Sequence, residues 1–113
     1  MSRERFEELV GDALDQVPEG LAALMDNVVV LVEDEPPQDD PDLLGFYDGT
    51  PLTERDTRYA GVVPDRIMIY RNPTLRMCED EDEVVDEVRI TVVHEIAHHF
   101  GIDDDRLHDL GYA

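Results

Sequence analysis

Apolar residues recur at helical spacing in two stretches of the chain, one near each end. In the first, apolar positions from Phe6 to Val17 alternate with an acidic face, which predicts an amphipathic helix ended by Pro18 and Gly20. The second begins with a run of acidic residues at 79–83, where a helix dipole favours anions. Its apolar positions repeat every four residues and predict one long helix with a single core face: Val84, Val88, Val92, Ile96 and Phe100.

Between these helices, three short stretches have the composition of strands. Val28–Val32 is a continuous apolar run, typical of a strand that is covered on both faces. Leu44–Tyr47 is a second candidate, followed by turn residues at 48–51. Asp65–Arg71 is the third and clearest, and Asn72 with Pro73 predicts a turn directly after it.

Length and composition narrow the possibilities further. A chain of 113 residues with 42% hydrophobic residues fits one domain, residues 1–113, with one core. Asp and Glu number 29 against 9 Arg and no Lys, a net charge of -20 that disfavours nucleic acid and anionic membrane surfaces as partners. Cys78 is the only cysteine, so an intramolecular disulfide and a cysteine-based zinc cluster are excluded.

Neither a signal-peptide pattern at the start nor an apolar run of membrane-spanning length is visible in the sequence. We therefore expect a cytoplasmic protein. The sequence does not indicate its oligomeric state.

The chemistry is concentrated in residues 94–104, which read His-Glu-Ile-Ala-His-His-Phe-Gly-Ile-Asp-Asp. On a helix, His94 and His98 lie about 40° apart and one turn from each other, so both imidazoles can bind one metal ion. Glu95 lies about 60° from His98, beside the expected metal and not on it. That is the place of a base for a metal-bound water.

The third ligand is expected beyond the helix. Gly101 follows the last helical turn and can take the left-handed conformation that ends a helix and reverses the chain. The reversal brings Asp104 back towards the histidines, and zinc accepts a carboxylate oxygen. The alternative third ligand is His108, four residues later on a short terminal helix expected over residues 106–110.

Three residues near the motif are expected to have other roles. His99 points about 140° away from His94, so we interpret it as a structural residue or a support for the ligands. Asp103 and Asp105 flank the site, and one of them is expected to cap the terminal helix.

The chain resembles the small bacterial zincin-like metallopeptidases, the minimal zincins of the HExxHxxGxxD type. The resemblance rests on residues 94–112, on Tyr47–Thr53 and on Pro64–Arg71. It implies an α+β fold: a small mixed sheet of three to four short strands packed against the N-terminal helix and the long motif helix, with a short terminal helix after it. Unlike the metzincins, which have a similar motif, the chain has no methionine among the nine residues after Asp104.

These features predict a zinc-dependent metallopeptidase acting on a peptide or protein substrate. Zinc would activate a water molecule, and Glu95 would act as general base. An extended substrate would pair with a sheet edge, for which we expect residues 65–71. The alternatives are a non-catalytic zinc or protein-binding module with a zincin fold, and a metal-dependent ribonuclease, which the net charge disfavours.

Overall fold

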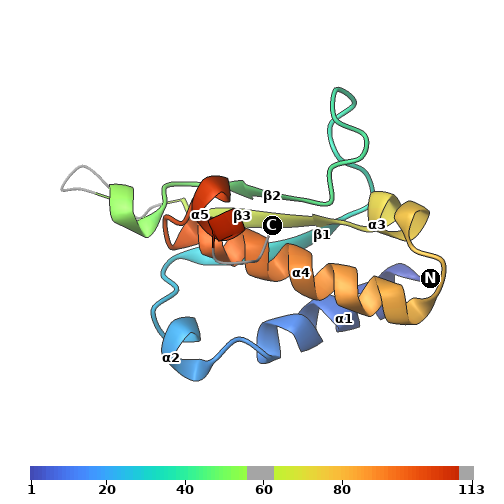
Figure 1. The fold of residues 1–113 in the computed structure, drawn as a ribbon, viewed down its shortest axis with the longest axis horizontal. Coiled ribbons are helices and arrows are strands. Elements are labelled where there is room, and N and C mark those ends of the chain that lie inside the picture. Colours follow the sequence, from blue (N-terminus) through green and yellow to red (C-terminus); the bar gives the residue numbers. More distant parts are fainter. Residues whose placement is uncertain (56–62, 110–113) are drawn as a thin grey trace.

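The structure, a computed structural model, describes residues 1–55 and 63–109, apart from the side chains of residues 107 and 108. The predicted α+β class is confirmed, with the N-terminal helix, the long motif helix and the short terminal helix all present (Figure 1). In chain order the elements are α1 (Arg3–Asp15), α2 (Glu19–Ala22), β1 (Val28–Glu33), β2 (Gly45–Asp48), the short 3-10 helix η1 (Leu52–Glu54), β3 (Asp65–Tyr70), α3 (Arg71–Met77), α4 (Glu81–His99) and α5 (Asp104–Asp109).

The described strands form one mixed sheet in the order β1-β3-β2. Strand β3 lies in the centre, parallel to β1 and antiparallel to β2. Ile67 and Ile69 of β3 are completely buried, which agrees with the position of this strand. The prediction that residues 65–71 form a sheet edge is therefore wrong, because β3 pairs on both sides.

Helices α1 and α4 lie on the same side of the sheet, and no described helix covers the opposite face of β1 (Figure 1). Along β1, Val28, Val30 and Val32 pack on the core, whereas Val29 and Leu31 are each 40% exposed. The prediction of a strand covered on both faces is thus wrong for β1. A continuous apolar run does not distinguish a strand covered on both faces from one covered on a single face.

Helix α4 begins and ends where the sequence predicts. Asp80 caps its start by accepting from the backbone N–H of Glu83 (2.8 Å). The buried face includes four members of the predicted ladder, Val84, Val88, Val92 and Ile96.

Gly101 ends the helix with a φ of +85°, and the N–H of Ile102 donates back to the carbonyl of Ala97 (2.9 Å). This is a glycine-terminated helix end, and the expected chain reversal at Gly101 is confirmed.

The predicted turn at Asn72 and Pro73 is instead the first turn of helix α3. Proline is tolerated there because the N–H groups of a first turn have no partner inside the helix.

Two arginines of α3 form ion pairs with the acidic loop between β1 and β2. Arg71 pairs with Asp34 (2.9 Å), and Arg76 pairs with Glu35 (3.2 Å).

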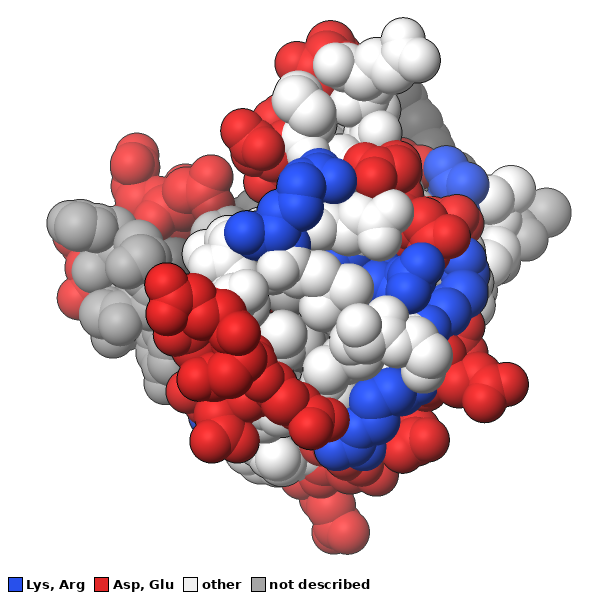
Figure 2. Space-filling view, turned by 90° about the vertical axis from the view of Figure 1, so that its right-hand side faces the viewer, with Lys and Arg blue, Asp and Glu red and all other residues white. Residues whose placement is uncertain are grey.

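Arginine side chains gather on this end of the molecule, among many acidic ones (Figure 2). Arg3 reaches Asp34 and Arg5 reaches Glu81 in the same region. In the described part of the chain, no helix is both long and apolar enough to cross a membrane.

Candidate metal centre

The C-terminal half of α4 presents the predicted histidines together. The rings of His94 and His98 lie 4.7 Å apart, centroid to centroid, as expected for residues one turn apart. One ligand atom from each of His94, Glu95 and His98 lies within 4.8 Å of the others. The two histidines are partly exposed, whereas Glu95 is only 4% exposed.

The chain reversal at Gly101 brings Asp104, the first residue of α5, back to these histidines. One carboxylate oxygen of Asp104, Oδ1, lies 2.9 Å from Nε2 of His94 and 2.9 Å from Nε2 of His98. Asp103, one residue earlier, accepts from the backbone N–H of Arg106 (2.9 Å) and so caps α5, as one of the flanking aspartates was expected to do. The side chain of His108, the alternative third ligand, lies outside the described residues.

This arrangement of donor atoms fits a zinc ion. Tetrahedral zinc with bonds of about 2.1 Å holds its ligand atoms roughly 3.4 Å apart. The 2.9 Å separations therefore need to widen by roughly 0.5 Å. Asp104 can supply that movement, because its side chain is 74% exposed. Two neutral imidazoles and one carboxylate also leave a fourth position open for water or substrate.

Glu95 lies directly beside this donor set, and by distance its carboxylate belongs to one group of possible ligand atoms with His94 and His98. Its Oε1 is 3.3 Å from Nδ1 of His98, on the other side of the ring from the atom that faces Asp104. Burial raises the pKa of Glu95, and the neighbouring His98 and His94 oppose part of that effect. Strand β2 comes close at this point, because a Cβ on Gly45 would lie 2.6 Å from Cγ2 of Thr91 and 3.3 Å from Cγ of Glu95.

Two hollows meet at the donor set and form one cleft. The first, about 380 Å³, runs between β2 and the exposed flank of α4, and the second, about 450 Å³, lies towards η1 and the Gly101 turn. Tyr47, His98 and Asp104 line both. A larger hollow of about 560 Å³ lies at the other end of α4, but none of the motif residues lines it.

Comparison with known protein families agrees with this geometry. A model of the zincin-like metallopeptidases matches residues 25–112, which include the sheet and the motif helix. The chain belongs to the zincin-like metallopeptidase family. The expected resemblance to minimal zincins is thereby confirmed, and the family implies a metal centre.

A solved structure resembles this zincin-like protein, whereas no curated protein matches it. A solved structure with a similar fold is the conserved hypothetical protein TTHA0227 from Thermus thermophilus, with a TM-score of 0.66 and 25% sequence identity. The match covers 88% of this chain and 94% of that one.

The zincin motif also carries His99, and the structure shows why this residue is not a ligand. Its side chain is completely buried on the sheet side of α4. Nε2 accepts from the backbone N–H of Asp26 (3.2 Å), so the ring proton is on Nδ1, which faces Asp65 Oδ2 at 3.2 Å. Burial lowers the pKa of His99, which agrees with a neutral ring.

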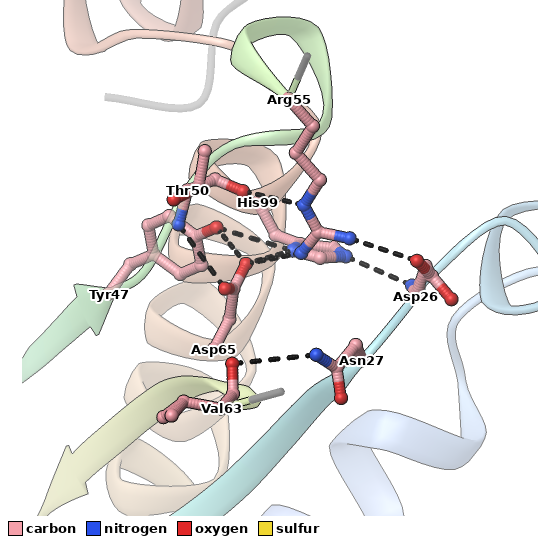
Figure 3. A network of polar contacts seen from close by, with 8 residues as sticks. All are labelled: Asp26, Asn27, Tyr47, Thr50, Arg55, Val63, Asp65 and His99. Atoms are coloured by element: carbon pink, nitrogen blue, oxygen red, sulfur yellow. Dashed lines mark hydrogen bonds and ion pairs between the residues drawn. The ribbon is translucent and has the colours of Figure 1, made fainter. Parts of the chain in front are cut away.

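Around His99 lies a polar network that the sequence did not reveal (Figure 3). Asp65 is 3% exposed and is bound by Tyr47, Arg55 and the backbone of Thr50. Burial alone would raise the pKa of Asp65, but these hydrogen bonds outweigh it and lower the pKa. No local signal in the sequence indicated this network, because a carboxylate at the start of a predicted strand is usually exposed.

Proposed function

We propose that this zincin-like protein is a zinc-dependent peptidase with Glu95 as its general base. The observation that carries the proposal is the position of Asp104 Oδ1, 2.9 Å from Nε2 of both motif histidines, next to a buried Glu95. In this proposal His94, His98 and Asp104 hold the metal. The exposed cleft over them gives a substrate access.

The chemistry follows from these positions. Zinc, when bound, lowers the pKa of a coordinated water and polarises the carbonyl of the peptide bond. The carboxylate of Glu95 takes the proton from the attacking water and passes it to the amine that leaves. His98 keeps Glu95 in place, because its Nδ1 faces Glu95 while its Nε2 faces the metal position.

The substrate is held by the open edge of strand β2. The carbonyl of Leu44 accepts from the N–H of Tyr70 (2.9 Å), so the polar backbone groups of residue 44 point towards β3. The direction of these groups alternates from one residue to the next in an antiparallel strand. The backbone N–H and C=O groups of Gly45 and Tyr47 therefore point to the opposite edge of β2, beside the cleft. An extended peptide can pair with β2 there and pass over the metal ligands.

A direct experiment tests the proposed function. The protein is loaded with zinc, its metal content is measured, and it is incubated with a diverse peptide mixture that is analysed by mass spectrometry. We expect one zinc ion per chain and peptide fragments that disappear on chelation and return with added zinc. If the protein is fully loaded with zinc but cleaves no peptide, the result would favour the non-catalytic module. In that module the metal only links α5 to α4 and so stabilises the fold.

The apolar side chains that line the cleft indicate which substrates are preferred. Leu43, Leu44, Phe46 and Ile90 line the hollow between β2 and α4. Ile90 is 52% exposed and lies one helical turn before His94, on the same flank. An apolar side chain next to the scissile bond can therefore be partly buried against Ile90.

We expect Ile90→Asn to lower kcat/KM about tenfold for peptides with Leu or Phe near the cleaved bond, because that apolar contact is lost. Peptides with Ala there should be affected much less. The control is Leu24→Asn, since Leu24 is 62% exposed and does not line the cleft. Equal losses for Leu and Ala peptides would contradict the assignment, and kinetic assays with both series measure the difference.

A further inference from the structure

The carboxylate of Asp65, at the start of β3, joins β2, the segment that follows β2, and helix α4 (Figure 3). Its Oδ2 accepts from Nη2 of Arg55 (2.7 Å) and from the hydroxyl of Tyr47, and it also faces Nδ1 of His99 (3.2 Å). Its Oδ1 accepts from the backbone N–H of Thr50 (3.2 Å). Charge-assisted hydrogen bonds in such a buried place are stronger than those at the surface.

Through these bonds Asp65 fixes residues 47–55, which we term the wall segment. Arg55 closes this segment on itself by donating from Nε to the carbonyl of Thr50 (2.9 Å). Gly49 packs so closely on Asp65 that a Cβ at this position would overlap the carboxylate. The shape of the wall segment thus depends on this one buried acid.

The wall segment also supports the chain turn at Gly101, which leads to Asp104. Gly101, with its φ of +85°, packs directly against Thr53, and a Cβ on Gly101 would overlap the threonine side chain. Asp104 is 74% exposed, so its position is set mainly by the turn that carries it and little by packing of its own side chain. From the other side, His99 links Asp65 to the helical turn that holds His98.

We propose that Asp65 is a positioning residue for the metal ligands. It acts on His98 through His99, and on the turn from Gly101 to Asp104 through the wall segment. This polar network supports the ligands from the sheet side. The inference rests on the proposed metal site but does not require turnover.

The test compares metal affinity in Asp65→Asn and in the wild type. Zinc dissociation constants are measured by competition with a chromophoric chelator, at a temperature where circular dichroism shows both proteins to be folded. We expect Asp65→Asn to bind zinc about tenfold more weakly, the lower end of the range for residues that orient metal ligands. The visible absorption of the cobalt-substituted protein should change as well, because it reports ligand geometry.

A matched control separates positioning from general stability. Val84→Ala removes buried methyl groups from the first turn of the same helix, far along α4 from the metal ligands. It should lower the melting temperature but leave zinc affinity and the cobalt spectrum unchanged. Equal weakening of zinc binding in Val84→Ala and Asp65→Asn would overturn the proposal.

A milder variant keeps the test decisive if Asp65→Asn does not fold. Tyr47→Phe removes the hydrogen bond of its hydroxyl to Asp65 and the 3.4 Å contact of that hydroxyl with Nδ1 of His99, and leaves Arg55 and Thr50 on Asp65. We expect it to weaken zinc binding less than Asp65→Asn does, about threefold. Wild-type affinity in the folded variants contradicts the positioning role while leaving the proposed peptidase intact. Absence of zinc binding in the wild-type protein would instead refute the proposed metal site, and this inference with it.

Discussion

Glu95→Gln is expected to retain zinc and to lose peptide cleavage by a factor of about 100 to 10,000, the usual contribution of a general base. The amide has nearly the same shape as the carboxylate, so the buried position of this side chain beside Gly45 stays filled. It cannot accept the proton of the attacking water. Since the proposed ligands His94, His98 and Asp104 are unchanged, the metal content should equal that of the wild type.

Glu87→Gln provides the matched control for this prediction. Glu87 lies two turns earlier on the same helix and lines the same hollow, but it does not belong to the group formed by His94, Glu95 and His98. Its substitution should leave the turnover number within about twofold of the wild type. Steady-state kinetics with zinc-loaded proteins measure both variants. Wild-type cleavage by Glu95→Gln would contradict the mechanism.

Asp104→Ala is expected to weaken zinc binding by more than about 100-fold, beyond the range found for residues that only support ligands. The reason is its contact with both histidines, since one oxygen lies 2.9 Å from each Nε2 atom. The remaining pair of histidines on α4 leaves two positions open to water. Zinc competition with a chelator measures the loss directly.

Two comparisons make the result for Asp104 specific. Asp105→Ala removes an exposed carboxylate from the next position of the same helix and should leave zinc affinity close to that of the wild type. His108→Ala decides between the alternative third ligands. If His108→Ala weakens binding as strongly as Asp104→Ala, the assignment of Asp104 alone is wrong.

The arrangement of the motif residues was predictable from the sequence because these residues are close in the chain. Helical spacing places His94, Glu95 and His98 relative to one another, and Gly101 ends the helix. The structure brings Asp104 to the histidines as that spacing predicts. Their roles in metal binding and catalysis stay predictions.

Long-range features were harder to predict. The sequence contains no local signal that Asp65 would meet His99, 34 positions away, or that Arg55 would join them. The same limit explains why β3 was expected at an edge, since strand order depends on pairing and not on the composition of one strand. At Asn72 and Pro73 the local signal was real but ambiguous, because proline favours both turns and the first turn of a helix.

The two halves of helix α4 differ in the residues they contribute to the proposed metal site, and this difference decides where the protein can be stabilised by substitution. In its N-terminal half, from Glu81 to about Val88, the buried side chains contact the core, and Glu87 is the residue that lines the cleft. In its C-terminal half, core residues such as Val92 and Ile96 alternate with the residues of the proposed metal site. Stabilising substitutions of buried side chains in the first half should leave activity unchanged. In the second half, substitutions that raise stability are expected to lower activity.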